Sequence, residues 1–495
     1  MPRSAPPRSI AELVPEAVGQ PAATVLVSGI TADSRTVRPG DLFVALEGQR
    51  GHGMKFAAAA AAAGATAILT DAAGAASTPA SPVPLLVVPS PRRALAIAAA
   101  RLYAVQPATA VAVTGTSGKT SVAEFTRQIF AEAGYAAASL GTLGVVKPGG
   151  AVYGSLTTPD PVTLHETLAG LATEGITHLA FEASSHGLDQ HRLDGVALTA
   201  AAFTNLGRDH LDYHATEADY LAAKLRLFSE LLRSGQTAVV NADGARAGDV
   251  IATAEASGLA VMTVGRNGRD LRLVEHRREG FAQVLAVEAV GRRHDVRLPL
   301  VGDYQVENAL VAAGLAMAAG VGTEAALRAL GKLEGVPGRL DVVGEKTGAL
   351  VVVDYAHKPE ALAAAIAGVR PFVTGRLICV MGCGGDRDKG KRPIMGRIAA
   401  ENADIVIITD DNPRTEDAAA IRAEILAGVP FGVGDVTDMD DRGAAIRAAV
   451  NRADKGDVVL ICGKGHETGQ IVGTKVFPFS DHEVARAAIE ESARG

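Results

Sequence analysis

The chain has 495 residues, more than one hydrophobic core usually organises, so about two to four domains are expected. Its formal net charge of −7 argues against nucleic acid or an anionic membrane surface as a partner. The N-terminal residues lead into no apolar signal core, and the alanine-rich run at 56–69 is too short and too broken by glycine to span a bilayer, so we expect a cytoplasmic protein without membrane insertion.

The first segment, residues 1–105, predicts a small α/β domain. An apolar run at 42–46 precedes an alanine-rich helix, the run at 67–69 is typical of a strand, and a helical connection spans 92–102. Polar turns at 31–35 and 48–53 would suit a ligand, although such turns are also common as solvated loops.

The second segment, residues 106–338, predicts a larger, mostly parallel sheet flanked by helices. Short apolar runs alternate with helical patterns, as in other sheets of this kind. The expected strands are 111–113, 178–181, 200–203, 237–240 and 260–264.

The first of these strands leads into a glycine loop at 114–121. Gly115 and Gly118 allow backbone N–H groups to turn toward an anion, Lys119 supplies a point charge for terminal phosphates, and the Thr120 hydroxyl suits Mg²⁺. Val113 stands where the general motif has its first glycine. The loop, which also contains Thr116, Ser117 and Ser121, therefore predicts a site for a nucleoside triphosphate.

Two further side chains in this segment follow strand ends. Glu182 ends an apolar strand, where parallel sheets place their ligands, and is a candidate Mg²⁺ partner beside Thr120. His210 lies in a polar cluster after another strand. It is either a metal ligand or an ordinary exposed or hydrogen-bonded histidine.

A lysine interrupts the apolar face of the helix expected at 217–232. At about 100° per residue, Lys224 falls within the stripe of apolar residues rather than on the polar side. One reading is that its ammonium reaches solvent past a packed stem. The other is that desolvation favours the neutral amine, which takes up CO₂ to become a carbamate and a ligand for a second Mg²⁺.

The third segment, residues 339–495, predicts a separate, Rossmann-like parallel α/β domain. Strands are expected at 349–353, 377–381, 405–409 and 458–462, and helices near 359, 393 and 416. The loops 382–388, 410–414 and 463–467 follow three of these strands and should meet at one rim of the sheet. Arg387 occupies the place of the third glycine of a dinucleotide fingerprint, so NAD is not predicted. The cysteines Cys379, Cys383 and Cys462 lack metal or redox spacing and are expected to be buried thiols in a reducing cytosol.

Several motifs occur in order along almost the whole chain: 114–120, 157–160, 182–188, 204–214, 308–310, 338–341 and 354–359. Together they closely resemble the Mur ligases. The resemblance implies an α/β protein with three domains: an N-terminal one for a UDP-sugar, a central P-loop ATPase domain, and a Rossmann-like one for the incoming amino acid, with the third closing onto the second. It further implies ATP as co-substrate and Mg²⁺ as cofactor. The sequence does not decide the oligomeric state, and we expect a monomer.

The resemblance also implies roles for individual residues. Lys119 and Thr120 would serve the phosphates and Mg²⁺, and Glu182, His210 and carbamylated Lys224 the metals. Nucleotide contacts would come from Asn308, Arg339 and Asp354. Ser34 matches a uridine-contacting motif, whereas 49–51 departs from the family pattern. Residues placed at the muramoyl dipeptide are Thr157, Thr158, Ser184, Gln190 and Arg192.

The third segment decides the amino acid. Two arginines and an acid suit a zwitterion, and Arg387 and Arg414 could each bind one carboxylate of diaminopimelate while Glu467 receives its distal ammonium. Lysine lacks the distal carboxylate. The sequence Asp411-Asn412-Pro413-Arg414 matches the family's diaminopimelate-specific motif, and Gly463 opens the loop that carries Glu467.

The expected activity is therefore ATP-dependent amide formation between the D-glutamyl γ-carboxylate of UDP-N-acetylmuramoyl-L-alanyl-D-glutamate and meso-diaminopimelate, through an acyl phosphate, in peptidoglycan synthesis. The alternatives are a lysine-adding Mur ligase, a folylpolyglutamate-type ligase and, from another class, a P-loop nucleotide switch. A switch would hydrolyse ATP without forming an amide.

Overall fold

The computed structural model describes residues 6–48, 51–77, 80–152, 156–207, 209–210 and 213–492. Contacts divide the chain into two units: residues 1–272 with 310–326, and residues 273–309 with 327–495. The division falls within three elements, β17 (Leu271–Glu279), α10 (Asp303–Ala318) and α11 (Thr323–Leu330). Within the described ranges, no helix has both the length and the hydropathy needed to cross a membrane.

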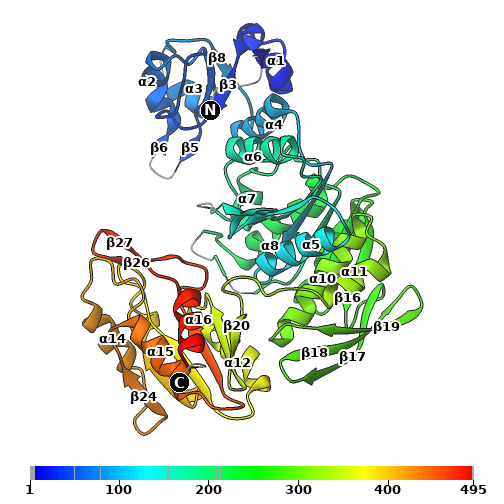
Figure 1. Ribbon diagram of the computed structural model, residues 1–495. Coiled ribbons are helices and arrows are strands. Elements are labelled where there is room, and N and C mark those ends of the chain that lie inside the picture. The colour runs from blue at the N-terminus through cyan, green and yellow to red at the C-terminus, as the bar shows by residue number, and fades with distance from the viewer. Residues whose placement is uncertain are drawn as a thin grey trace. The chain divides into compact units, whose positions relative to one another are not determined.

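The N-terminal part of the first unit is a four-stranded parallel sheet in the order β3-β4-β7-β8 (Figure 1). Apolar side chains cover both faces, because these short strands are buried on either side. Its strands are β3 (Gly29–Thr31), β4 (Asp41–Val44), β7 (Ala67–Thr70) and β8 (Leu85–Val87). Its helices are α1 (Ile10–Leu13), α2 (Ala57–Ala62), α3 (Ala72–Ser77) and α4 (Pro91–Tyr103). Two small pairs complete it, β1 (Arg8–Ser9) with β2 (Leu26–Val27) and β5 (Glu47–Gly48) with β6 (Gly51–His52).

The central sheet has the strand order β12-β11-β10-β13-β9-β14-β15-β16-β17 within the first unit. Strand β9 lies between β13 and β14 and is parallel to both, so the loops that follow these three strands share one edge. The strands are β9 (Thr109–Thr114), β10 (Ala137–Gly141), β11 (Gly144–Lys147), β12 (Gly150–Val152), β13 (His178–Glu182), β14 (Ala200–Phe203), β15 (Thr237–Asn241) and β16 (Ala260–Gly265). The helices are α5 (Lys119–Glu132), α6 (Pro161–Thr173), α7 (Ser185–Asp189), α8 (Glu217–Arg226) and α9 (Ala247–Ala256).

The helix expected at 217–232 is shorter than predicted. Its α-helical part, α8, ends at Arg226 and continues as one π-helical turn, Leu227–Leu231, and Leu232 is extended. Leu227 and Phe228 are both fully buried in this turn. The wider turn keeps the apolar side chains on the core, and the spacing of apolar residues alone does not distinguish it from an α-helix.

The second unit contains a six-stranded sheet in the order β20-β21-β25-β22-β23-β24. All neighbours are parallel except β20 and β21. Residues of α12, α13 and α14 pack on one face and residues of α15 and α16 on the other (Figure 1). The strands are β20 (Asp341–Lys346), β21 (Ala349–Asp354), β22 (Leu377–Met381), β23 (Ile405–Ile408), β24 (Asp435–Asp438) and β25 (Val458–Cys462). The helices are α12 (Pro359–Val369), α13 (Lys391–Asn402), α14 (Ala418–Leu426), α15 (Arg442–Arg452) and α16 (Asp481–Ser492).

Several antiparallel pairs were not predicted from the sequence, among them β10 with β11, β11 with β12 and β20 with β21. Two others are hairpins. One joins β18 (Ala282–Ala289) to β19 (Arg292–Leu298), and the other joins β26 (Gly469–Val472) to β27 (Lys475–Pro478). Otherwise the predicted strands and helices are confirmed to within about two residues; α13, for example, begins at Lys391 and α14 at Ala418. The three cysteines are free thiols and buried, as predicted.

Candidate active site

The glycine loop after β9 has the geometry that the sequence predicts. Gly115 has a φ of +150°, and a Cβ there would lie 1.9 Å from Thr204 Oγ1. Gly118 has a φ of +88° and precedes the first residue of α5, Lys119. Both positions therefore need glycine, one for space and the other for a left-handed backbone. The loop delivers the N-terminus of α5, the positive end of the helix dipole, to the carboxyl edge of the sheet, which suits an anion.

The segment after β14 holds this loop in place. Thr116 N–H donates to Asn205 O (2.8 Å), and Ser117 N–H donates to Asn205 Oδ1 (3.1 Å). Thr204 Oγ1 donates to Ser117 O (2.6 Å). Sequence reasoning gave Thr204 and Asn205 no role, although their position directly after a strand neighbouring β9 is a usable signal.

Lys119 lies over its own loop. Its Nζ donates to Gly115 O and Thr116 O, both at 2.9 Å. Thr120 and Ser121 follow in the first turn of α5 and are buried. The ammonium is thus held by the carbonyl groups of the glycine loop.

Lys224 is buried against the same loop. Its side chain is 1% exposed, Nζ donates to Gly115 O (2.8 Å), and Nζ lies 4.3 Å from the centre of the Tyr220 ring. Of the two readings of Lys224, the ammonium that reaches solvent is therefore wrong. Burial, and then the charge of Lys119, lower the pKa of Lys224 well below its usual value. This favours the neutral amine that carbamate formation requires.

Glu182 lies beside the start of the glycine loop, because it pairs in register with Val113 of β9. It is 2% exposed, and its Oε1 accepts from Thr142 N–H (2.7 Å). A Cβ at Gly141 would lie 2.2 Å from Oε1, so that glycine makes room for the carboxylate.

His210 belongs to a group of aromatic rings around the loop. Its ring centre lies 4.9 Å from that of His186 and 6.0 Å from that of Tyr220. The Tyr220 hydroxyl is 3.1 Å from Thr116 Oγ1, so Tyr220 connects the glycine loop, Lys224 and His210. No role for Tyr220 was predicted from the sequence.

The unmodified side chains near the glycine loop supply only some of the ligands that a magnesium ion needs. Within the residues that the structure describes, no group of three or more His, Cys, Asp and Glu side chains is arranged to hold a metal ion. The candidate ligands are the Thr120 hydroxyl, the Glu182 carboxylate, His210 and Lys224. A carbamate on Lys224 would add the second anionic oxygen ligand that Mg²⁺ prefers.

The residues implied at the muramoyl dipeptide form one hydrogen-bonded group. Arg192 Nη1 donates to Thr158 O (2.7 Å) and Nη2 to Gln190 Oε1 (2.8 Å). Ser184 N–H donates to Thr158 Oγ1 (3.1 Å). Thr157 Oγ1 lies 3.1 Å from Thr142 Oγ1, next to the Glu182 contact.

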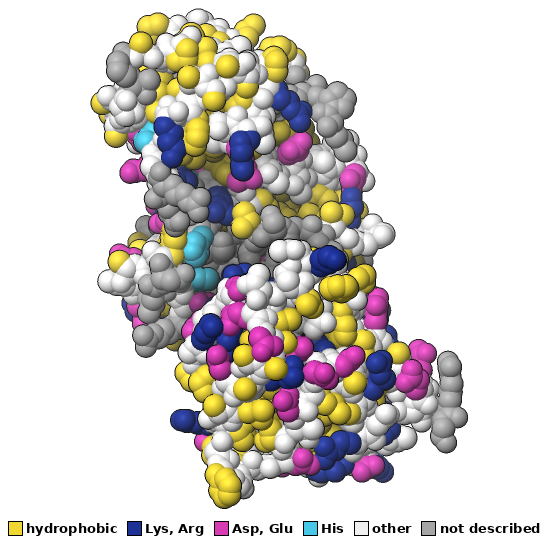
Figure 2. Space-filling model, turned by 90° about the vertical axis from the view of Figure 1, so that its left-hand side faces the viewer, with side chains coloured by type: hydrophobic (Ala, Val, Ile, Leu, Met, Phe, Trp, Pro, Cys, Tyr) yellow, Lys and Arg dark blue, Asp and Glu magenta, His cyan; other side chains and the backbone are white. Residues whose placement is uncertain are grey.

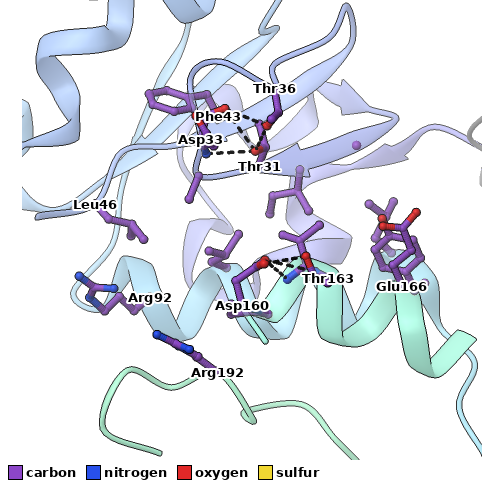
Figure 3. Close-up of a pocket in the computed structure, with 18 of the residues that line it drawn as sticks. Thr31, Asp33, Thr36, Phe43, Leu46, Arg92, Asp160, Thr163, Glu166 and Arg192 are labelled. Carbon is purple, nitrogen blue, oxygen red and sulfur yellow. Dashed lines mark hydrogen bonds between the residues drawn. The ribbon is translucent and has the colours of Figure 1, made fainter. Parts of the chain in front are cut away.

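Gln190 and Arg192 of this group line a cavity of about 1790 Å³ within the first unit. Ser34, in the turn after β3, also lines it. Arg92, Arg192 and Asp160 lie in the same part of the cavity in Figure 3, and both basic and acidic side chains border the hollow in Figure 2. The lining contains both cations, such as Arg92 and Arg192, and acids, such as Asp160 and Glu166, so basic side chains are available to an anionic ligand without the cavity being uniformly positive. Gln49 and Arg50 lie outside the described residues, and Gly51 lines the cavity.

The three residues implied at the nucleotide also lie together, in the second unit. Asn308 Nδ2 donates to Gln305 Oε1 (2.9 Å), and Gln305 Nε2 donates to Arg339 O (3.0 Å). Asp354 accepts from Leu340 N–H (2.8 Å). Burial raises the pKa of Asp354 to about 6, although Arg339 and this backbone bond act in the opposite direction.

The loops after β22, β23 and β25 meet at one rim, as predicted. Gly385 N–H donates to Asn412 O (2.9 Å), and Asn412 Nδ2 donates to Glu467 Oε2 (2.9 Å). A Cβ at Gly463 would lie 2.5 Å from Asp411 Oδ2, so glycine allows the third loop to approach the second.

The two arginines differ in how firmly they are held. Arg414 has a φ of +51°; its Nη1 donates to Gly385 O (2.8 Å), and its N–H donates to Ile471 O of β26 (3.0 Å). Pro413 precedes it and is buried. Arg387 is exposed, and its Nη1 donates to Asp386 O (3.3 Å). Arg414 is thus fixed by the unpredicted hairpin, whereas Arg387 keeps its guanidinium toward solvent.

Comparisons with known proteins show the family of the chain. Three family models match the chain in order: "Mur ligase family, catalytic domain" at residues 26–103, "Mur ligase middle domain" at 113–316, and "Mur ligase, glutamate ligase domain" at 338–465. A protein of Bradyrhizobium diazoefficiens is 57% identical over 96% of this chain and 97% of its own length, and one of Agrobacterium fabrum is 56% identical over 94% of each. Both are named UDP-N-acetylmuramoyl-L-alanyl-D-glutamate–2,6-diaminopimelate ligase.

Solved structures give the same result. A structure of a UDP-N-acetylmuramoyl-L-alanyl-D-glutamate–2,6-diaminopimelate ligase matches with a TM-score of 0.74 and 33% identity, over 99% of this chain and 100% of that one. Folylpolyglutamate synthase of Mycobacterium tuberculosis has a TM-score of 0.60 at 17% identity over 82% of this chain and 95% of that one, which shows a shared fold alone. The predicted fold class, a three-domain α/β architecture with a large, mostly parallel central sheet, is confirmed. The chain belongs to the Mur ligase family.

Proposed function

We propose that this protein joins meso-diaminopimelate to the D-glutamyl γ-carboxylate of UDP-N-acetylmuramoyl-L-alanyl-D-glutamate, with ATP as the co-substrate, in peptidoglycan synthesis. The names and high identity of the relatives support the overall reaction. The observation that carries the choice of amine is the rim of the second unit, where Arg414, Asn412 and Glu467 are held by neighbouring loops. A guanidinium close to a carboxylate suits an acceptor that carries both charges.

The first step activates the acid. A carboxylate is a poor acyl donor at neutral pH, so the γ-phosphate of ATP is transferred to it, giving an acyl phosphate and ADP. Lys119, now bonded to Gly115 O and Thr116 O, would turn to the phosphates and stabilise the charge that develops on them. Asn308, Arg339 and Asp354 contact the nucleotide in this proposal.

Magnesium ions are proposed at Thr120, Glu182, His210 and carbamylated Lys224. When bound, Mg²⁺ neutralises phosphate charge during transfer. The chain's own contribution is to keep Lys224 desolvated and next to Gly115 O, and to hold the Glu182 carboxylate through Thr142 N–H.

The second step forms the amide. The amine of diaminopimelate attacks the acyl carbon, phosphate leaves, and the amine loses its proton. Arg387 and Arg414 would each bind a carboxylate of the acceptor, and Glu467 its distal ammonium. Thr157, Thr158, Ser184, Gln190 and Arg192 would orient the dipeptide, and Ser34 the uridine, so most of the rate enhancement comes from positioning and electrostatics.

The three buried thiols support a reducing, cytoplasmic setting. The proposed reaction is tested by phosphate release with purified protein, ATP and Mg²⁺, leaving out one substrate at a time. We expect release only when both the UDP-muramoyl dipeptide and diaminopimelate are present. Release of similar size without the amine would instead indicate a nucleotide switch and contradict the proposal.

A further inference from the structure

Lys464 is a buried cation at the rim proposed for the amino acid. It follows Gly463 in the loop after β25, and its side chain is 0% exposed. Its Nζ donates to Glu467 Oε2 and to Asn412 Oδ1, both at 3.0 Å. A buried ammonium is costly unless it is paired and hydrogen-bonded, and these two side chains supply that pairing.

The contacts of Lys464 fix the orientation of the Asn412 amide. Asn412 Oδ1 accepts from Lys464 Nζ and from Ile471 N–H (2.9 Å), and both of these groups can only donate. The Nδ2 group must therefore point the other way, where it donates to Glu467 Oε2 (2.9 Å). The three side chains of Lys464, Asn412 and Glu467 thus close a ring of hydrogen bonds.

The ring also sets the position and charge of Glu467. Both donors converge on Oε2, which restrains the carboxylate, while 32% of the side chain stays exposed. The ammonium of Lys464 offsets the carboxylate charge at close range. A bare ammonium arriving from solvent therefore meets a nearly neutral pair rather than an isolated anion.

We propose that Lys464 is a positioning residue that makes this rim selective for a zwitterionic amino-acid end over a bare ammonium. The inference rests on the proposed function. With Glu467 partly neutralised, an amine gains most of its binding energy only when an accompanying carboxylate reaches an arginine such as Arg414. L-Lysine offers its side-chain ammonium without that carboxylate.

Lys464→Met tests this directly, because methionine keeps an apolar stem and removes the charge. The ammonium would no longer offset the carboxylate charge of Glu467, and Asn412 Oδ1 would lose one of its two hydrogen-bond donors. We expect the KM for diaminopimelate to rise about 10-fold to 100-fold, the range for losing a hydrogen bond to a charged group, because the ammonium no longer holds Asn412 and Glu467 in place. The KM for ATP should not change, and the ratio of kcat/KM for diaminopimelate to that for L-lysine should fall.

Lys464→Gln separates donation from charge. Glutamine keeps an N–H donor for Asn412, so the KM for diaminopimelate should rise less than in Lys464→Met. The ratio of kcat/KM for diaminopimelate to that for L-lysine should stay low, because the charge is still absent. The control is Lys475→Met on β27, the exposed partner strand of the β26 strand that carries Ile471. It removes a lysine that does not contact Asn412 or Glu467, so the KM for diaminopimelate and the kcat/KM ratio should not change.

Phosphate release with each amine is measured for the four proteins. If the wild type uses no diaminopimelate, the proposed function fails, whatever the variants do. If the wild type does use it but both Lys464 variants keep the wild-type selectivity ratio, this inference is overturned, even when activity falls, because a merely structural loss lowers use of both amines equally. If Lys464→Met does not fold, the ratio for Lys464→Gln decides.

Discussion

Replacing Arg414 by alanine should selectively impair use of diaminopimelate. The backbone at this position is held by main-chain bonds, from Arg414 N–H to Ile471 O (3.0 Å) and from Gly473 N–H to Arg414 O (2.7 Å). Arginine and alanine both carry a Cβ, so the φ of +51° is equally strained in both. The substitution therefore removes the guanidinium and leaves the loop.

The expected loss follows from what the guanidinium contacts. It donates one bond to Gly385 O (2.8 Å) and, in our proposal, a bidentate pair to a carboxylate of the acceptor. Removing one partner of such a pair costs about 2–5 kcal/mol. This corresponds to a fall of about 30-fold to 5000-fold in kcat/KM for diaminopimelate.

Phosphate release at varied diaminopimelate and fixed ATP measures this effect. Arg414→Lys keeps the positive charge but lacks the paired N–H donors of the guanidinium, so its kcat/KM for diaminopimelate should lie between those of the wild type and Arg414→Ala. Arg486→Ala, on the exposed face of α16, is the matched control. A folded Arg414→Ala protein with an unchanged KM and kcat for diaminopimelate would refute the role of Arg414.

Four further predictions concern the rest of the molecule. Lys119→Ala should abolish phosphate release, and near-normal turnover would rule out the phosphate role of the glycine loop. Lys224→Ala should be inactive even with ample Mg²⁺, and added short carboxylates should restore some activity if a carbamate is the working form; no rescue at any concentration would count against the carbamate. The pKa of Asp354 is raised from 3.8 to about 6, so its contribution to the free energy of unfolding is complete below about pH 3.8 and is lost as pH rises through 6. The KM for ATP should rise as pH falls below 6, because the Asp354 carboxylate is then protonated. A flat profile of this KM from pH 5 to 8 would contradict the nucleotide role of Asp354. Arg442 and Asp481 form an ion pair in which both side chains are 0% exposed. Arg442→Met should therefore lower the free energy of unfolding of the second unit by about 3–5 kcal/mol in urea melts, and the double variant Arg442→Met/Asp481→Leu should recover most of this loss. Equal stability of Arg442→Met and the wild type would contradict the burial argument.

Much of the fold could be predicted because the central strands are buried on both faces. Strands such as β14 and β22 are continuous apolar runs, and their observed bounds equal the predicted ones. Some antiparallel strands were missed because they are mixed or exposed: β19 is mostly charged or polar, and β27 is exposed throughout. Strand β18 is mostly apolar and buried and was missed without such a reason. The predicted domain boundaries at 105/106 and 338/339 stay predictions.

The parts of the site that short continuous loops form could be predicted from the sequence. The loop from Gly115 to Thr120 and the three rim loops are contiguous in sequence, and each follows a strand. Side-chain partners were not predictable, because they depend on contacts between distant segments. Tyr220 touches Thr116 across 104 positions, and Lys464 touches Asn412 across 52. The roles assigned to individual site residues stay predictions.

The central claim is that one protein activates the D-glutamyl carboxylate and accepts only an amine with a second, distal acid. The most direct measurement is a competition: purified protein, ATP, Mg²⁺ and UDP-N-acetylmuramoyl-L-alanyl-D-glutamate are incubated with equal concentrations of meso-diaminopimelate and L-lysine, and the products are weighed by mass spectrometry. The account predicts the diaminopimelate adduct almost alone, with ADP and phosphate formed in equal amount. Comparable amounts of the lysine adduct would contradict it.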